Sequence, residues 1–136
     1  MLLREHLTPE SIGLAVAVGI FLGGLPLYGL HIVLCVGAAR VLKLNQALVY
    51  TAANISNPFF APFLISGQIL LGDWLRFGSA TGRTLPEGSV WNLIKLAPDV
   101  FISCLLGSLV EGVVLGGALG LLALWTARRW RRAEAP

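Results

Sequence analysis

Few side chains in this sequence could do chemistry, and the most telling ones lie in apolar surroundings. Glu111 sits deep in an apolar run, where a carboxyl group must be protonated, paired or turned to a polar cavity. His31 could bind a ligand or could satisfy a backbone carbonyl. Asn54, Ser56 and Asn57 lie close together and could donate hydrogen bonds to a bound group.

The sequence lacks the residue sets that carry out catalysis. It shows no Ser/His/Asp, Cys/His or paired-carboxylate arrangement, no phosphate-binding loop and no metal-ligand cluster. His6 and His31 stand 25 positions apart and form no catalytic pair, while Cys35 and Cys104 have the setting of small buried hydrophobes. We therefore expect a protein that is not an enzyme, with no catalytic residue, no metal and no cofactor.

The composition indicates an integral membrane protein. The chain has 136 residues, of which 56% are hydrophobic and only 12% are charged, and its mean hydropathy is +0.79. Soluble domains carry about a quarter charged residues, and a small domain has much surface to cover. The same hydrophobic content excludes intrinsic disorder.

Three apolar tracts, residues 12–39, 47–71 and 100–127, are each long enough to cross a hydrocarbon core of roughly 30 Å. The stretch from 73 to 99 is rich in Gly and Pro, so we expect mostly loop with a short interfacial helix near 90–96. The expected fold class is all-α: a polytopic integral membrane protein with two Pro/Gly-interrupted helical units and a final transmembrane helix. One membrane domain (1–136) would comprise the interrupted pair 8–75, the loop 76–99, the helix 100–127 and the basic tail 128–136.

The first two tracts are interrupted near their middles by Gly and Pro. Since proline removes a backbone donor, each helix should kink or break there. Each tract is then either one kinked span or a helical hairpin that enters and leaves on the same side. Paired interruptions point to a site at mid-membrane. The candidate ligand-binding residues are Gly24, Pro26, Gly29, His31, Asn54, Ser56, Asn57 and Pro58, with Arg40 and Lys43 at the interface.

The basic residues lean towards a cytoplasmic C-terminus without fixing the topology. Four arginines, Arg128, Arg129, Arg131 and Arg132, follow the last tract directly, and Trp125 and Trp130 flank this boundary, as is typical of a cytoplasmic anchor at lipid headgroups. Three single spans and two hairpins nevertheless give equal totals of basic residues on the cytoplasmic side.

Small residues recur every fourth position in the third tract, and the first tract repeats the pattern. Such a face lets another helix backbone approach closely. It could form a homodimer seam or pack tract three on tract one. The residues predicted to serve helix packing are Gly19, Gly23, Ser108, Gly112, Gly116 and Gly120.

The residues at the two interruptions resemble a known family. Gly19-Ile20-Phe21-Leu22-Gly23, followed by Pro26, Gly29 and His31, is similar to the G-x-F-x-G-x-x-P-x-x-G-x-Q signature of the bacterial domain-of-unknown-function 2062 family. Lys43-Leu44-Asn45 and Asn57-Pro58 with Pro62 match its later elements, although His31 replaces a Gln and Phe60 stands where a small polar residue is common. The resemblance implies a multi-pass protein of the bacterial inner membrane with unestablished activity.

Two functions follow as hypotheses. The first is binding or translocation of an anionic lipid or polyprenyl-phosphate headgroup, whose phosphate would meet free amides at the broken helices. The alternative is a non-catalytic accessory subunit that packs against a larger membrane complex through the small-residue face. A homo-oligomeric channel ranks third. The expected partners are membrane lipids and either further copies or a larger membrane complex, and no nucleic acid.

Overall fold

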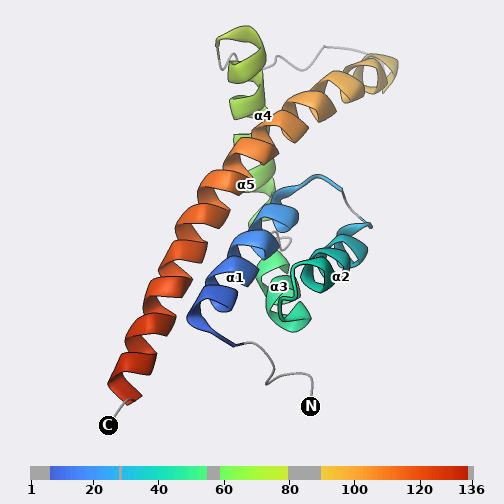
Figure 1. Ribbon diagram of the computed structural model, residues 1–136. Coiled ribbons are helices and arrows are strands. Elements are labelled where there is room, and N and C mark those ends of the chain that lie inside the picture. The colour runs from blue at the N-terminus through green and yellow to red at the C-terminus, as the bar shows by residue number, and fades with distance from the viewer. Residues whose placement is uncertain (1–6, 28, 55–58, 80–89, 135–136) are drawn as a thin grey trace.

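The computed structural model describes residues 7–27, 29–54, 59–79 and 90–134 (Figure 1). Within these residues all regular structure is helical, so the expectation of an all-α protein is confirmed. The helices are α1 (Pro9–Gly24), α2 (His31–Val41), α3 (Gln46–Ala53), α4 (Ala61–Phe77) and α5 (Val90–Glu134).

Both interrupted tracts are divided where Gly, Pro and Asn cluster. Helix α1 begins with Pro9, and the Thr8 hydroxyl caps it by accepting the Ser11 N–H at 3.1 Å. It ends at Gly24, because Leu25 precedes a proline and adopts an extended conformation. Gly29, with φ of +93°, then redirects the chain into α2.

The two breaks send the chain in different directions (Figure 1). After the first, α2 returns alongside α1, so the pair forms a helical hairpin. After the second, α4 continues in the direction of α3, and both run opposite to α5. The paired contacts agree, since Gly19 and Gly23 of α1 face Val49 and Ala53 of α3 in parallel order. The first tract is thus a hairpin, whereas the second is a helix interrupted along its length.

Helix α5 spans 45 residues, and both α1 and α4 pack against it. Within the described part of the chain, Ala97–Ala133 is the one segment long and apolar enough to cross a membrane. The helix expected near 90–96 is the first part of α5 and not a separate element, and the basic tail is helical as far as Glu134. Pro98 lies inside α5 and removes only one backbone donor. Arg76 of α4 donates to the carbonyl of the following residue, Asp99.

The small-residue face of α5 is covered by α1 within the same chain. A Cβ atom added at Gly116 would lie 2.7 Å from the Ala17 carbonyl oxygen, and one at Gly120 would lie 2.7 Å from the Ala17 Cβ. Gly112 faces Phe21 in the same way. The backbones of α1 and α5 therefore approach closely along three turns, as small-xxx-small patterns allow.

Both described chain ends lie at one end of the molecule (Figure 1). Arg128 of α5 forms an ion pair with Glu10 at 2.9 Å, and Arg131 donates to the Leu7 carbonyl. The Arg128 hydrogen bond holds the pKa of the exposed Glu10 carboxyl below its usual value. This contact is therefore present at neutral pH and is lost as acid protonates Glu10.

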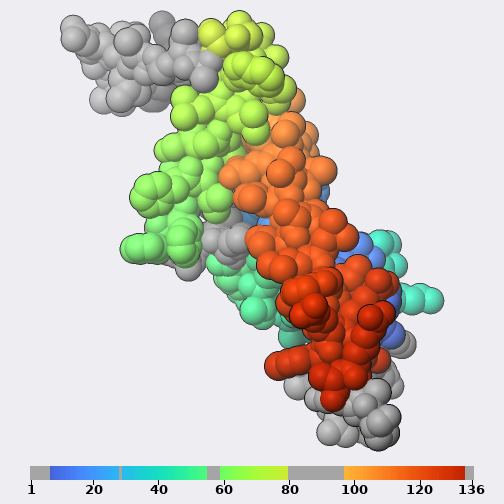
Figure 2. All heavy atoms as spheres, turned by 90° about the vertical axis from the view of Figure 1, so that its left-hand side faces the viewer, coloured from blue at the N-terminus to red at the C-terminus, as the bar shows by residue number. Residues whose placement is uncertain are grey.

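Large apolar side chains cover much of the outer surface. Val41, Phe63 and Val113 are 81%, 76% and 65% exposed. Figure 2 shows α4 and α5 side by side on one such face. The buried core is small by comparison and lies between α1, α2 and α3, where it consists of Ala15, Cys35, Ala39, Leu44, Val49 and Ala53. Apolar patches of this extent are rare on monomers that fold in water.

Candidate functional site at the helix breaks and the α4–α5 interface

A buried amide joins the first break to α4 and α5. The Gln68 side chain of α4 is 2% exposed and donates from Nε2 to the Gly24 carbonyl at 3.0 Å. Its Oε1 accepts a hydrogen bond from the Cys104 thiol of α5 at 3.3 Å. Gln68 thus satisfies a carbonyl left without a helical partner where α1 ends.

Glu111 lies next to this amide on the same side of α5. Its Oε2 atom is buried and has no hydrogen-bond partner among the described residues. The Gln68 amide lies close to the carboxyl group, and its described hydrogen bonds go to Gly24 and Cys104. The nearby Ser108 hydroxyl is occupied within α5, where it donates to the Leu105 carbonyl at 2.8 Å.

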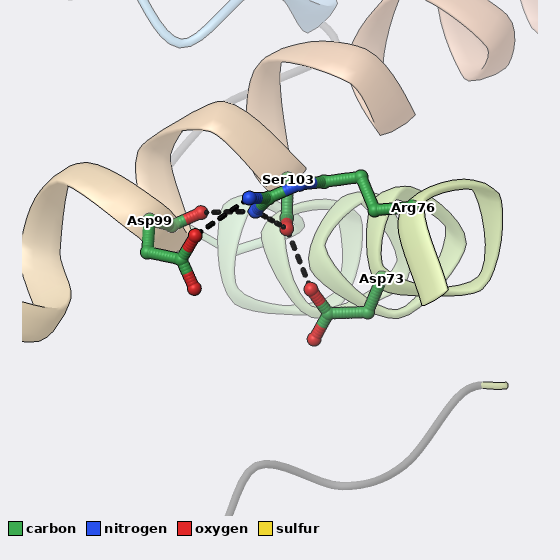
Figure 3. Close-up of polar contacts among 4 residues, drawn as sticks. All are labelled: Asp73, Arg76, Asp99 and Ser103. Atoms are coloured by element: carbon green, nitrogen blue, oxygen red, sulfur yellow. Dashed lines mark hydrogen bonds and ion pairs between the residues drawn. The ribbon is translucent and has the colours of Figure 1, made fainter. Parts of the chain in front are cut away.

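A second polar cluster lies further along α4 and α5 (Figure 3). Ser103 is fully buried and donates to Asp73 Oδ1 at 2.5 Å. Arg76 donates to the Ser103 hydroxyl at 2.8 Å and to the Asp99 carbonyl at 2.9 Å. It also forms an ion pair with Asp99 Oδ1 at 2.6 Å. We call these four residues the Arg76 cluster.

The Arg76 cluster and Gln68 lie on either side of the closest approach between α4 and α5. A Cβ atom at Gly72 would lie 1.8 Å from the Ser103 carbonyl oxygen, and one at Gly107 would lie 1.8 Å from the Gln68 carbonyl oxygen. The glycines bring the two backbones close enough for short polar side chains to bond across the interface. Both polar groups depend on this contact.

The residues predicted at the first break are placed as follows. Gly24 contributes its carbonyl to Gln68, and Pro26 is half-buried in the connection. Gly29 is exposed, and His31 is the half-buried first residue of α2. Arg40 and Lys43 are exposed near the other end of α2.

At the second break the structure describes only part of the predicted site. Asn54 is exposed, and its Nδ2 atom donates to the Tyr50 carbonyl of its own helix at 2.9 Å. Ser56, Asn57 and Pro58 lie outside the described residues. Helix α2 packs mainly on α1 and α3, whereas α4 packs mainly on α5. The starts of α2 and α4 therefore belong to different packing units.

The two helices that begin at the breaks, α2 and α4, have no side-chain cap at their N-termini, unlike α1 and α3. Leu30 and Phe60 precede α2 and α4 with similar backbone angles, and neither makes a side-chain capping hydrogen bond. By contrast, Thr8 caps α1 and Asn45 caps α3. First-turn N–H groups of an uncapped helix carry partial positive charge and can act as donors. At the start of α4, however, Pro62 has no N–H and the Phe63 N–H donates to the Phe60 carbonyl at 3.1 Å, so the donors lie mainly at the start of α2.

Sequence reasoning missed Gln68 and the Arg76 cluster. Gln68 interrupts an apolar run, and Asp73 and Arg76 follow it at helical spacings on one side. This pattern was a usable signal, but the stretch beginning at Asp73 was expected to be loop. The partner Ser103 is 30 positions away in the chain, and no local pattern identifies it.

The fold defines a class: an all-helical protein with two broken helical units, one helix that could span a membrane and polar side chains buried against that helix. The chain belongs to a family described as uncharacterized protein conserved in bacteria (DUF2062), whose model matches residues 1–135. The resemblance seen at the breaks is thereby confirmed and extends over nearly the whole chain. No curated protein and no solved structure is similar to it.

Proposed function

We propose that this protein is a multi-pass protein of the bacterial inner membrane. Helix α5 would cross the bilayer once and α3 with α4 would cross it as an interrupted span, while the α1–α2 hairpin would enter and leave on one side. The exposed Val, Phe, Leu and Trp side chains support this placement, because they need an apolar solvent.

The directions of the helices favour a cytoplasmic C-terminus. With α1 and α2 as a hairpin, seven of the ten Lys and Arg residues belong, by sequence position, to the end where α1 begins and α5 ends. Arg76, Arg83 and Lys95 belong to the opposite end. Cytoplasmic segments carry the excess of Lys and Arg, so both termini should be cytoplasmic.

Reporter fusions test this topology. Green fluorescent protein fused after Pro136 should fluoresce, and alkaline phosphatase at the same position should be inactive. Phosphatase inserted between Arg83 and Thr84 should be active, because the segment between α4 and α5 should be periplasmic. Activity at the C-terminus with none at the inserted site would show the opposite orientation.

We further propose that the protein binds the phosphate of an anionic lipid or polyprenyl phosphate at the start of α2 and of α4. The proposal is supported most directly at the start of α2, which lacks the side-chain cap that α1 and α3 have. The start of α4 also lacks a side-chain cap, but Pro62 and the bonded Phe63 N–H leave it fewer donors. Donors of a helix N-terminus at membrane depth need an acceptor, and phosphate suits them.

The surroundings of these helix starts suit an amphiphile better than a free anion. Ile32 and Val33 of α2 are 59% and 68% exposed, and Phe63 of α4 is 76% exposed. An acyl or prenyl chain could lie on these faces while its phosphate binds the N–H groups. Arg40 and Lys43, exposed at the end of α2, would attract the headgroup towards the protein.

A capping substitution tests this site. Leu30→Asp would place a carboxylate on the first-turn N–H groups of α2, where it would occupy the donors and repel phosphate. We expect binding of anionic lipid to fall at least about tenfold, which corresponds to about 1.4 kcal/mol. Native mass spectrometry from nanodiscs containing phosphatidylglycerol or undecaprenyl phosphate would measure retained lipid.

The matched controls separate charge from capping and from folding. Leu30→Asn supplies a neutral cap and should weaken binding less than Leu30→Asp. Phosphatidylcholine should be retained equally by all variants. Phe60→Asp tests the start of α4 in the same way. Unchanged retention of anionic lipid in both Asp variants would place the site elsewhere or show that there is none.

The accessory-subunit hypothesis was based on the small-residue face of α5 as a surface for a partner protein. The small-residue face of α5 is in contact with α1 of the same chain, so bulky substitutions there should disturb the fold before they affect a partner. A partner complex would need another face, and no described contact favours one.

A further inference from the structure

We propose that the protein binds one anionic phospholipid in a groove between the start of α1 and the end of α5, with the lipid phosphate on Arg129. The inference rests on the membrane placement proposed above, but it concerns a different site from the start of α2. It is based on the lining of the groove, on the position of Arg129 beside it and on the charges at this end of the molecule.

The groove lies where α1 begins beside the last turns of α5 (Figure 1). Its volume is about 590 Å³, within the roughly 300–1,000 Å³ of ligand sites. The lining is mostly apolar and includes Ile12 of α1 with Ala123 and Ala127 of α5. A Cβ atom added at Gly13 would lie 2.9 Å from the Gly120 carbonyl oxygen, so the two helices are packed backbone to backbone at this point. The groove is therefore a fixed feature of the α1–α5 packing.

Arg129 lines the groove and has no described carboxylate partner. Its guanidinium stacks on the Trp125 ring, 4.6 Å from the ring centre, and Trp125 also belongs to the lining. The Thr126 hydroxyl, on the same lining, donates instead to the Leu122 carbonyl of its own helix at 3.0 Å. Arg129 is thus the cation of the groove, and a guanidinium can bind phosphate through two parallel hydrogen bonds.

The other charges at this end of the molecule leave Arg129 as the arginine suited to an external anion. Arg128 forms an ion pair with Glu10 at 2.9 Å, and Arg131 donates to a backbone carbonyl. Among the described acidic residues of this end, Glu10 is therefore neutralised, and Glu134 lies more than one helical turn beyond Arg129. A phosphate at Arg129 would meet a positive surface.

The combination of one cation with apolar walls favours an anionic phospholipid as the occupant. A free anion would use Arg129 without the apolar lining, whereas a phospholipid can place its phosphate on the guanidinium and an acyl chain along the groove. Trp125 and Trp130 are 53% and 79% exposed, as suits indole rings at the level of the headgroups. Because Arg129 already covers the Trp125 ring, the choline group of phosphatidylcholine would meet a like charge there. We therefore expect phosphatidylglycerol to bind more tightly than phosphatidylcholine.

Tryptophan fluorescence with brominated lipids tests this site in the full chain. The background Trp74→Phe/Trp91→Phe leaves Trp125 and Trp130, both in the groove, as the sources of emission. In phosphatidylcholine bilayers, brominated phosphatidylglycerol should quench this emission at a lower mole fraction than brominated phosphatidylcholine does. The measurement is made in about 1 M salt, where the Debye length is about 3 Å and the general attraction of the basic tail for anionic lipid is screened.

Two arginine variants separate the groove from the tail as a whole. Arg129→Gln and Arg132→Gln make the same change in charge, but Arg132 is not part of the lining. Arg129→Gln should raise the mole fraction of phosphatidylglycerol at half-maximal quenching at least about fivefold, and Arg132→Gln less than about twofold. Ala127→Phe, which fills the groove, should abolish the preference for phosphatidylglycerol. Thermal unfolding followed by circular dichroism shows whether each variant is folded.

The remaining outcomes decide against the proposal. Equal effects of the two Gln variants would show attraction by the tail as a whole. Equal quenching by both lipids would show that the groove does not select an anionic lipid, as expected if a second copy or another part of the chain fills it. Quenching by neither lipid would refute the membrane placement together with the site. Leu30→Asp should leave the quenching unchanged, which separates this groove from the site at the start of α2.

Discussion

Gly107→Ala is expected to prevent the native packing of α4 on α5 and to lower the free energy of unfolding by at least about 3 kcal/mol. The added Cβ would lie 1.8 Å from the Gln68 carbonyl oxygen and 2.6 Å from its carbonyl carbon. These neighbours are backbone atoms, so rotation of a side chain cannot relieve the clash. Thermal unfolding in detergent, followed by circular dichroism, measures the loss.

Two glycines of the same helices provide the control. Nothing lies within 4 Å of a Cβ atom built at Gly117 of α5 or at Gly67 of α4. Alanine there should change stability by no more than about 1 kcal/mol, in the stabilising direction, because alanine favours helix. If Gly107→Ala and Gly117→Ala unfold alike, the close approach of α4 and α5 is not a feature of the folded protein.

The same contact explains why a single methyl group would affect a functional site. Gln68 holds the Gly24 carbonyl and accepts from the Cys104 thiol while its own backbone lies against Gly107. Displacing α4 by the width of a methyl group would move this amide away from both. Gly107→Ala should therefore also break the hydrogen bond from Gln68 to the Gly24 carbonyl in any molecules that remain folded, and the Gly24 carbonyl chemical shift would report the loss.

The sequence predicts the helix boundaries at the breaks because their causes are local. Thr8 and Pro9 start α1 through a cap and a fixed φ angle, and Pro26 forces the preceding residue into an extended conformation. Such signals act over three or four residues and can be recognised without knowledge of the fold. The breaks after Gly24 and Ala53 were predicted for this reason.

The direction of the chain after each break could not be predicted in the same way. Both breaks contain Pro and small or polar residues, yet α2 turns back along α1 while α4 continues beyond α3 (Figure 1). The difference depends on which helix offers a partner. Helix α4 is fixed by close contacts with α5, of Gly72 with Ser103 and of Gln68 with Gly107, more than 30 positions away in the chain. Long-range packing of this kind has no signal within either break.

The residues of the candidate site also differ in whether the sequence alone could identify them. Glu111 was recognised because a carboxyl group in an apolar run is conspicuous, whereas its neighbour Gln68 was overlooked inside a similar run. The importance of Gln68 arises from two elements that meet at its side chain: the end of α1, through the Gly24 carbonyl, and α5, through the Cys104 thiol. A single amide in a sequence does not reveal such a meeting point.

Arg76→Met is expected to lower the free energy of unfolding by about 3 kcal/mol, since removing one partner of a buried polar network leaves the others uncompensated. Asp73 and Ser103 are 2% and 0% exposed, and Arg76 is their described cationic neighbour. Asp99, whose side chain is 42% exposed, contributes little to this loss because solvent screens its ion pair. The expected loss of stability therefore comes mainly from the buried Asp73 and Ser103 side chains.

A double variant that also removes the negative charge of Asp73 tests whether the cluster is coupled. In the double variant Asp73→Asn/Arg76→Met the buried group is neutral, so we expect it to be more stable than Arg76→Met alone, although each change by itself destabilises. Arg129→Met, at an arginine that stacks on Trp125 with 4.6 Å between guanidinium and ring, is the exposed control and should have little effect. If the two single substitutions add without any recovery, the Arg76 cluster does not act as a coupled unit. If the double variant regains stability, the buried cluster holds α4 on α5 through the balance of its charges. Gly72 brings the two helix backbones close together, and this short distance lets a side chain as short as Ser103 connect them.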